Sequence, residues 1–376
     1  MQSSVNTLTP AEAPAVLTEV RGRVGFITLN RPKALNALSL EMVRLLTDCL
    51  MVWREDANIQ AVAIRGMNKN GAFGAFCAGG DIRFFHQAAL AGEPALGDFF
   101  TEEYRLNHLI HTYPKPYIAF MDGIVMGGGM GISQGASHRL VTERTKMAMP
   151  ETHIGLFPDV GGGYFLSRCP GRYGEWLGLT GEVIGAGQAI ALGLADSVVA
   201  VDQLQSAWDA LATADLDQPG ALASWLAIYL EQPSPYSLPA TEQIDHYFAL
   251  NTVQEIVRAL EGDRDHWGQQ TAAVLRKRSP LMLQVVLEQI RRARTLSLAD
   301  DLRMERNMVH HCFHPKHLGR NAAESETVEG IRALAVDKDH TPRWDPVRIE
   351  EVTAAMVSPF FNSPWTPADH PLCDLR

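Results

Sequence analysis

The sequence predicts a mixed α/β fold that is followed by a mainly helical C-terminal region. In the first part of the chain, short runs of branched apolar residues alternate with segments whose apolar residues recur every three or four positions. This alternation is typical of a sheet covered by helices, and beyond residue 202 only the helical spacing persists. Because 376 residues exceed what one hydrophobic core usually serves, we expect a core domain over 16–201, a helical region over 202–376 and a flexible N-terminus over 1–15.

The first predicted elements are a strand pair, a helix and a buried strand. Val16–Val20 and Val24–Leu29 alternate apolar and polar residues on either side of a tight turn. Ser39 is a good N-cap, and apolar residues follow it at helical spacing, which predicts an amphipathic helix over Ser39–Trp53. Ile59–Arg65 is apolar enough for a strand that is buried on both faces.

Two glycine-rich loops follow predicted strands. Gly71–Asp81 offers little except backbone to a ligand, and after a helix over Asp98–His111 and a strand over Tyr117–Met121 comes a second such loop, Gly123–Gly129. Neither loop has the spacing of a phosphate-binding or dinucleotide-binding motif. The alternative to a ligand-binding role is that such a segment is a flexible surface loop. One N–H group from each loop, directed into a single pocket, would form an oxyanion hole.

Two carboxylates follow the second loop, Glu151 and Asp159, eight residues apart across Pro158. The chain can fold back there and set both around one acyl group, where their environments would separate them into acid and base. Each has a structural alternative, because Glu151 can complement a helix dipole and Asp159 can cap a helix that opens at Gly161. Spacing alone leaves both interpretations open.

The remaining elements are mostly helical. Strands are expected at Arg139–Thr142 and Ala195–Val201. Helices are expected at Met130–Ala136, Gly161–Arg168, Arg172–Thr180, Ala186–Leu192, Ala207–Leu211, Ala221–Leu230, His246–Leu260, Leu281–Ala293 and Glu329–Leu334, with breaks at Pro233, Pro235 and Pro239.

The composition argues against several classes of protein. With 43 acidic and 33 basic residues, a general nucleic-acid binder is not expected. The five cysteines are odd in number and scattered, which favours a reducing compartment, and no stretch has the length and hydropathy of a membrane span. The N-terminus lacks the pattern of a signal or transit peptide, so we expect a soluble cytoplasmic protein. The histidines between His310 and His317 match no standard metal-ligand spacing, and no metal site is predicted.

Several motifs, in order and spacing, resemble the crotonase (enoyl-CoA hydratase/isomerase) superfamily. They are Phe76–Ile82, Met126–Gly131 and Pro150-Glu151 with the glycine triplet that begins at Gly161. The longer stretch Ala148–Phe165, together with Glu329–Ala333 and Asp337–Asp339, resembles the 3-hydroxyisobutyryl-CoA hydrolase subfamily, and the likeness runs from about Val16 to about Pro346. It implies a spiral of β-β-α units, with 16–201 as the catalytic core.

The resemblance also implies roles for individual residues. The N–H groups of Gly80 and Gly128 would form the oxyanion hole for the thioester carbonyl, and Glu151 and Asp159 would be the catalytic carboxylates. CoA belongs to the substrate, so no separate cofactor is implied. Three further residues would bind substrate: Glu103 at the acyl part, Ala78 beside the adenine of CoA, and Lys33 at a phosphate.

Two positions depart from the family pattern. Gly131 stands where hydratases of this superfamily carry a second catalytic glutamate, and its absence disfavours addition of water to an enoyl-CoA. Gly74 stands where relatives often have a lysine, so that Arg83 or the Arg276–Arg278 cluster would have to take over a CoA phosphate contact.

We therefore expect a hydrolase that cleaves a short 3-hydroxyacyl-CoA, with 3-hydroxyisobutyryl-CoA of valine breakdown as the expected substrate. The alternatives are a hydratase or isomerase that uses Glu151 alone and a non-catalytic acyl-CoA-binding protein. The partner is then an acyl-CoA, not a nucleic acid or a membrane. The C-terminal helices would either assemble subunits into a homo-oligomer or fold back on their own subunit.

Overall fold

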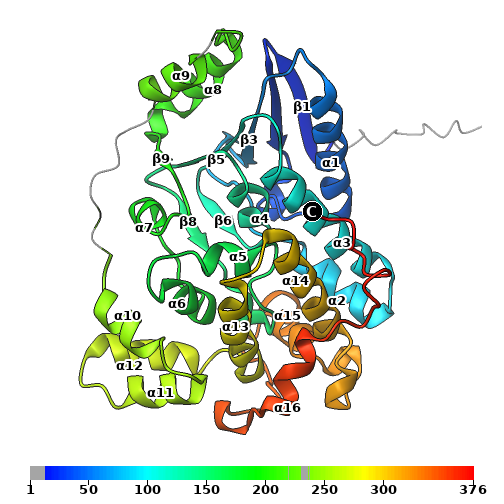
Figure 1. The fold of residues 1–376 in the computed structure, drawn as a ribbon, viewed down its shortest axis with the longest axis vertical. Helices are drawn as coiled ribbons and strands as arrows, with labels where there is room; N and C mark the ends of the chain where they lie inside the picture. The colour runs from blue at the N-terminus through cyan, green and yellow to red at the C-terminus, as the bar shows by residue number, and fades with distance from the viewer. Residues whose placement is uncertain (1–12, 219, 230–235, 237) are drawn as a thin grey trace, which may run out of the picture.

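The computed structural model describes residues 13–218, 220–229, 236 and 238–376. Residues 1–12 of the predicted N-terminal segment, Leu230 at the end of one predicted helix, and the predicted breaks at Pro233 and Pro235 lie outside the described residues. Figure 1 shows a sheet with helices packed around it and, below the sheet, a group of helices formed by the later part of the chain.

The large sheet begins with the strand pair that the sequence predicts. β1 (Val16–Arg21) runs antiparallel to β2 (Val24–Leu29). Parallel strands then continue the sheet, in the order β3 (Ala61–Asn68), β5 (Tyr117–Met121), β7 (His138–Val141) and β9 (Ser197–Val198), and β4 (Gly71–Ala72) pairs with β3. Every residue of β2 and β5 is buried, as expected for parallel strands covered on both faces.

A second, smaller sheet holds the segments that carry the predicted site. β6 (Ile124–Met126) pairs in parallel with β8 (Lys146–Ala148), and Cys77 forms a parallel bridge to Val125 of β6. The chain visits the two sheets alternately: β3 precedes the Cys77 segment, β5 precedes β6, and β7 precedes β8. Each turn of the chain therefore adds one segment to each sheet, which is the spiral that the resemblance implies.

Alternate residues of the strands feed two separate cores. On one face, Ile27, Ile64 and their neighbours pack with α1 (Leu40–Glu55). On the other face, the strands pack against α8 (Leu204–Thr213) and α9 (Ala221–Tyr229), where the ring of Trp208 lies 4.7 Å from that of Phe26 and 5.3 Å from that of Phe120. Aromatic pairs at these separations add to the stability gained from burial alone.

The helices of the later chain pack onto the first core and bring distant segments to the small sheet. α13 packs on α6, α14 packs on α3, and α15 packs on the one-turn helix η2 (Glu151–Ile154). The bounds are α2 (Ile82–Ala91), α3 (Ala95–His111), α4 (Gly128–Gln134), α5 (Gly162–Leu166), α6 (Tyr173–Thr180), α7 (Ala186–Ala191), α10 (Thr241–Tyr247), α11 (Val253–Glu261), α12 (His266–Leu275), α13 (Pro280–Ala293), α14 (Leu298–Phe313), α15 (Glu326–Ile331) and α16 (Ala354–Val357).

The structure corrects some predicted elements. The single helix expected over His246–Leu260 is two helices, α10 and α11, because Thr252 begins a new helix with a capping box to Glu255. β6 lies inside the predicted loop Gly123–Gly129, and β8, α2, α12 and α14 are additional. The boundary near Asp202 stays a prediction.

Neither a membrane-spanning helix nor a group of metal-ligating side chains is found among the described residues. No helix is both long and apolar enough to cross a membrane. No three His, Cys, Asp or Glu side chains are grouped to hold a metal ion, and the rings of His310 and His314 stack on each other with centroids 4.4 Å apart.

Candidate active site

The predicted site residues gather at one edge of the small sheet. Gly80, Gly128 and Glu151 each follow one of its three parallel segments, which contain Cys77, Met126 and Ala148. The carboxyl ends of parallel segments meet at the same edge, where α/β proteins commonly bind ligands. Three motifs that lie far apart in the sequence are therefore brought together by the pairing of these short segments.

The Gly80 N–H group is left free by the way its segment pairs. Leu38 and Gly80 form a parallel bridge in which the Leu38 N–H donates to Gly79 O (2.8 Å) and the Asp81 N–H donates to Leu38 O (2.9 Å). In such a bridge the intervening residue directs its own N–H group to the opposite side. Accordingly, no acceptor for the Gly80 N–H is found among the described residues. Gly80 also lines a cavity.

The Gly128 N–H group is free because it stands at the first position of α4. The first N–H groups of a helix have no partner within it, and no acceptor for this one is found elsewhere in the described chain. The two loops touch, since a methyl group added at Gly79 would lie 3.7 Å from the Gly128 nitrogen. Gly79 and Gly127 have φ of +110° and +48°, values that favour glycine.

Three buried carboxylates line the same cavity, which has a volume of about 300 Å³. Glu103, Glu151 and Asp159 are 2%, 7% and 5% exposed. A methyl group at Gly128 would lie 2.6 Å from Glu103 Oε1, and one at Gly127 would lie 2.8 Å from Glu151 Oε1. Both glutamates therefore lie against the glycine loop. From the sequence, Glu103 would be expected on a mostly polar face of the helix over Asp98–His111. That expectation is wrong, because Glu103 is buried and this face of α3 packs against the core.

Burial controls the charge of these acids. It raises the pKa of Glu103 and of Glu151 well above the ordinary value, and the neighbouring Asp159 raises both further. The pKa of Asp159 is raised by burial to about 7, against the effect of a hydrogen bond that Tyr104 donates to it. Three acids in one cavity cannot all ionise at neutral pH, so the site holds a mixture of carboxylate and carboxylic acid.

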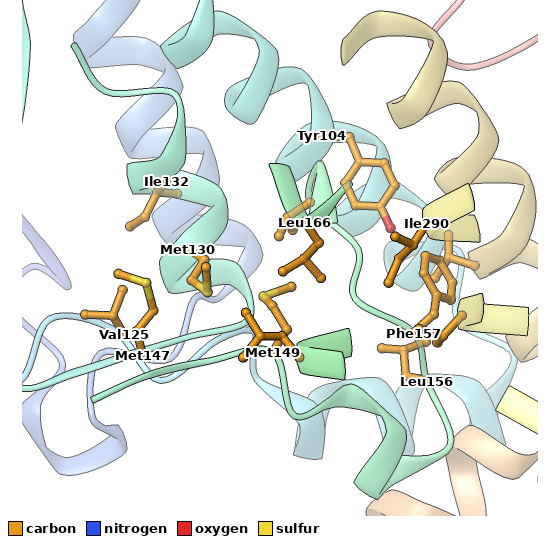
Figure 2. Close-up of a cluster of buried hydrophobic side chains, with 14 of the residues drawn as sticks. Tyr104, Val125, Met130, Ile132, Met147, Met149, Leu156, Phe157, Leu166 and Ile290 are labelled. Atoms are coloured by element: carbon orange, nitrogen blue, oxygen red, sulfur yellow. The ribbon is translucent and has the colours of Figure 1, made fainter. Parts of the chain in front are cut away.

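Asp159 accepts a hydrogen bond from a residue that the sequence pattern did not reveal. The Tyr104 hydroxyl donates to Asp159 Oδ2 over 2.9 Å. Figure 2 shows Tyr104 among the apolar side chains of the neighbouring elements, including Phe157, Leu166 and Ile290. Since burial keeps the pKa of this phenol well above its ordinary value, Tyr104 remains a hydrogen-bond donor.

Two residues of the C-terminal helices fix the backbone around Asp159. Glu305 of α14 accepts hydrogen bonds from the Gly161 N–H (2.7 Å) and the Gly163 N–H (2.9 Å). Gln289 of α13 donates to Pro158 O (2.6 Å) and to Glu305 Oε1 (3.1 Å). The sequence carries no signal for this support, because Glu305 lies in a stretch of α14 that also holds Asp300, Arg303 and Arg306.

The C-terminal motifs that carried the resemblance also reach the site. A methyl group at Gly330 would lie 2.3 Å from the carbonyl carbon of Ile154, so α15 packs directly on η2, the helix of Glu151. The Thr327 hydroxyl donates to Gly155 O (2.7 Å). Arg332 pairs with Glu329, Asp337 and Asp339, which explains why these charged residues occur together.

The predicted CoA contacts lie at the edge of the cavity or outside it. Ala78 lines the cavity, and its N–H donates to Leu35 O (3.0 Å). Lys33 is exposed on η1 (Pro32–Ala34), near that segment, and is not part of the cavity lining. Gly74 has a φ of +83°, and a methyl group there would meet Asn68 Nδ2 at 2.1 Å, which accounts for glycine at this position.

The other basic candidates for CoA contacts differ in whether they already bind another residue of the protein. Arg276 pairs with Glu261 and Glu350, and Arg278 donates to Thr180 O. Both already have partners within the protein. Arg83 is exposed on α2.

Gly131 is closely packed. A methyl group at this position would lie 2.6 Å from Val160 Cβ and 2.9 Å from Asn107 Nδ2. Val160 directly follows Asp159 and has a φ of +58°, a conformation that β-branched residues rarely adopt. The space that a side chain at Gly131 would need is therefore filled by the segment that carries Asp159.

A family model described as enoyl-CoA hydratase/isomerase matches residues 24–361. The chain belongs to the enoyl-CoA hydratase/isomerase family. Two similar relatives are named probable 3-hydroxyisobutyryl-CoA hydrolase 3 (Arabidopsis thaliana) and mitochondrial 3-hydroxyisobutyryl-CoA hydrolase (Danio rerio). They are 38% and 40% identical to this chain, over 94% and 93% of it and over 92% and 89% of their own lengths.

A solved structure described as a carnitinyl-CoA dehydratase from Mycobacterium thermoresistibile superposes with a TM-score of 0.84. It is 38% identical in sequence and covers 94% of this chain and 98% of its own. The crotonase fold predicted from the motifs is thus confirmed. These relatives are about equally similar to this chain, yet two are named hydrolases and one is named a dehydratase. The geometry of the site is therefore needed to distinguish between the two reactions.

Proposed function

We propose that the protein is a thioester hydrolase that cleaves 3-hydroxyisobutyryl-CoA to the free hydroxy acid and CoA. The observation that carries the proposal is the composition of the cavity. The N–H groups of Gly80 and Gly128, which have no acceptor among the described residues, lie beside Glu151 and Asp159, while Gly131 has no room for a second glutamate. The names of the Arabidopsis and zebrafish relatives support the same activity.

Thioester cleavage needs a place for negative charge on the carbonyl oxygen. Two preorganised N–H donors supply it, and the loss of one such donor typically raises the barrier by about 3–4 kcal/mol. The Gly80 and Gly128 N–H groups are suited to this role because they come from two loops that touch at Gly79. Neither group has to break a hydrogen bond within the described chain before it binds substrate.

Glu151 is the proposed nucleophile or base. As a nucleophile, its carboxylate attacks the thioester carbonyl, the C–S bond breaks, CoA leaves as the thiolate, and water then hydrolyses the mixed anhydride. As a base, it removes a proton from the water that attacks the carbonyl. Asp159, with a pKa of about 7, holds the substrate hydroxyl or the water and relays a proton. Glu103 contacts the acyl part.

The size of the cavity supports a short acyl group. Its volume of about 300 Å³ lies at the low end of ligand pockets. Much of the wall is apolar, with Phe85, Phe100 and Leu156 among its residues, which suits the methyl branch of the substrate. Leu334 lines the cavity from the C-terminal region and is 40% exposed, so this region borders the entrance.

Release of free thiol from a panel of acyl-CoAs tests the proposal. We expect hydrolysis of 3-hydroxyisobutyryl-CoA and a drop in kcat of at least about 10³-fold in Glu151→Gln, since this substitution removes the proposed nucleophile or base. Glu182→Gln, at an exposed position, is the matched control and should match the wild type. No thiol from any 3-hydroxyacyl-CoA, while a thioether analogue still binds, would refute the hydrolase proposal.

A hydration assay separates this activity from the one in the name of the solved dehydratase. The hydrolase proposal predicts that methacrylyl-CoA and crotonyl-CoA lose their enoyl absorbance at less than about one-hundredth of the thiol-release rate, because the site lacks a carboxylate at Gly131. Rapid loss of that absorbance without thiol release would instead make the protein a hydratase.

A single turnover in ¹⁸O-labelled water separates the two roles of Glu151. Water that opens an anhydride at the enzyme side leaves label in the Glu151 carboxylate, which peptide mass spectrometry detects. Label in the product alone points to activated water, provided that water does not open the anhydride at the acyl carbonyl.

The cellular setting follows from the substrate. We propose a role in valine breakdown and retain the cytoplasm as the expected location, although the zebrafish relative is named mitochondrial. Cell fractionation decides the location. Gel filtration with light scattering decides whether the C-terminal helices assemble subunits or fold back on their own.

A further inference from the structure

A second cavity lies beside the active site and has no role in the proposed reaction. It has a volume of about 350 Å³ and is formed by α2, α3 and α14. Phe100 of α3 lines both this cavity and the active-site cavity, so a ligand in one would contact a wall of the other. Most of the remaining lining is apolar, including Ala88, Leu96 and Phe313.

Two charged residues line this cavity: Arg306, which is only 6% exposed, and Glu93, which is exposed. Arg306 Nε donates to Thr101 Oγ1 (3.0 Å), and Arg306 Nη2 donates weakly to Gly97 O (3.4 Å). No Asp or Glu oxygen of the described residues lies within 4.0 Å of the guanidinium nitrogens, and the nearby acids Glu93 and Asp98 are exposed. A buried charge without a partner is costly, so proteins normally provide a counter-ion.

The groups around Arg306 hold it in position without neutralising it. The ring of Trp365 lies 4.7 Å from the guanidinium carbon, in a cation–π contact that leaves the charge in place. His310 also lines the cavity, and burial lowers its pKa to about 4, so at neutral pH it adds a hydrogen-bonding group and no charge. The cavity therefore combines one buried cation, the uncharged His310 and a largely apolar wall with the exposed carboxylate of Glu93.

We propose that this cavity binds a small aliphatic carboxylic acid, whose carboxylate pairs with Arg306 and whose hydrocarbon body lies against Ala88, Leu96 and Phe313. A guanidinium matches the planar geometry of a carboxylate and can bind it through two parallel hydrogen bonds. A phosphate would bring more negative charge than one arginine balances and would face an apolar wall. The site is separate from the thioester site and does not depend on the proposed function.

Trp365 provides a local reporter of binding. The protein is labelled with 5-fluorotryptophan and titrated with sodium isobutyrate at constant ionic strength, and Trp365→Phe assigns the one signal of interest among the seven tryptophans. We expect a saturable shift of the Trp365 fluorine signal, because its ring contacts the guanidinium that the carboxylate would bind. Arg306→Gln should weaken the binding, measured by calorimetry, at least tenfold.

A second pair of variants keeps the test decisive if Arg306→Gln does not fold. Ala322 lines the cavity and is half-buried, whereas Ala323 is exposed and does not line it. Ala322→Phe should weaken isobutyrate binding at least tenfold with Arg306 intact, and Ala323→Phe should leave it unchanged. No saturable shift in the wild type, or equal binding by both alanine variants, would overturn the proposal. Inorganic phosphate that binds as tightly as isobutyrate would overturn it as well, since the site would then be a general anion site.

Discussion

At the level of single residues, the site depends on acids that are buried before any substrate binds. Glu103, Glu151 and Asp159 lie in one cavity, and burial favours the protonated form of each. Only Asp159 receives a hydrogen bond from a neighbouring side chain, the Tyr104 hydroxyl, which stabilises its ionised form. Burial raises the pKa of Asp159, and this hydrogen bond and one from the backbone lower it, which leaves a pKa of about 7.

Tyr104→Phe should move a pKa of the reaction upwards. The substitution removes the hydrogen bond that stabilises the Asp159 carboxylate, and hydrogen bonds to charged groups contribute about 1.5–3 kcal/mol, or about one to two pKa units. We expect the inflection near pH 7 in the pH profile of kcat to shift to higher pH. Tyr113→Phe, which removes a hydroxyl that bonds to Leu50 O, is the control. An unchanged inflection would show that Asp159 is not the titrating group.

The packing of Gly131 leads to a prediction about the pair that it forms with Val160. Gly131→Ala should destabilise the fold by about 1–3 kcal/mol, because its methyl group would lie 2.6 Å from Val160 Cβ. In a Val160→Gly background the same change should cost less, since the Val160 side chain is gone and only the contact with Asn107 Nδ2 remains. Urea unfolding of the two single variants and the double variant measures this coupling. Additive effects would contradict the close contact.

At the level of elements, three short parallel segments and the helices α13 and α14 assemble the site. The segments of the small sheet end at the Gly80 loop, the Gly128 loop and η2, while α14 holds the backbone beyond Asp159 through Glu305. The proposed catalytic motifs thus lie in the first half of the chain, and their positions depend on the second half. The spiral winding brings the three segments together, because it returns the chain to the same edge of the small sheet three times.

Glu305→Gln should lower kcat more than it changes KM. The amide keeps one good acceptor for the two N–H groups of Gly161 and Gly163 and loses the other, so the turn that carries Asp159 should be less well fixed. We expect a decrease in kcat of about tenfold or more with a KM within about threefold. Asp300→Asn, on the exposed side of the same helix, should have neither effect. A KM effect alone would assign Glu305 to substrate binding.

Much of this arrangement could be predicted from the sequence, and the exceptions have physical causes. The strand pair β1–β2, α1 with its Ser39 cap, and β5 follow from periodicity, since each is long enough to show a pattern. β6 and β8 have three residues each, too few for a periodic signal. The pairing of such segments depends on tertiary contacts, so the meeting of Gly80 and Gly128 came from the family motifs and not from local pattern.

The supporting residues of the site were harder to predict than the catalytic candidates. Glu103 and Glu305 are glutamates in helices, where the usual position is a solvated face. Both are buried because other helices cover them, which no single-helix pattern reveals. The glycine loops and the Glu151–Asp159 segment were visible because a glycine or an acid in an unusual local context carries its own signal.

At the level of the whole molecule, the buried acids make the stability of the fold depend on pH. The pKa of Asp159 is raised from an ordinary value of 3.8 to about 7, so the folded state retains a proton that the unfolded chain releases. The unfolded state then binds fewer protons between these values, and the free energy of unfolding falls as pH rises from about 4 to about 7. Burial also raises the pKa values of Asp301 and Glu326 to about 7, so these two acids change the free energy of unfolding in the same direction.

Asp159→Asn should therefore stabilise the fold by an amount that grows with pH. Relative to the wild type, the gain in unfolding free energy should increase by about 1.4 kcal/mol per pH unit between about 4 and 7 and then level off, because above pH 7 Asp159 is ionised in both states. Urea unfolding at several pH values measures this gain, with Asp300→Asn at an exposed site as the control. A gain of equal size at pH 5 and pH 8 would mean that Asp159 is ionised throughout in the folded protein. The outcome bears on function as well. An acid that destabilises the fold at the working pH lowers stability, and its role in the reaction would explain why it is retained.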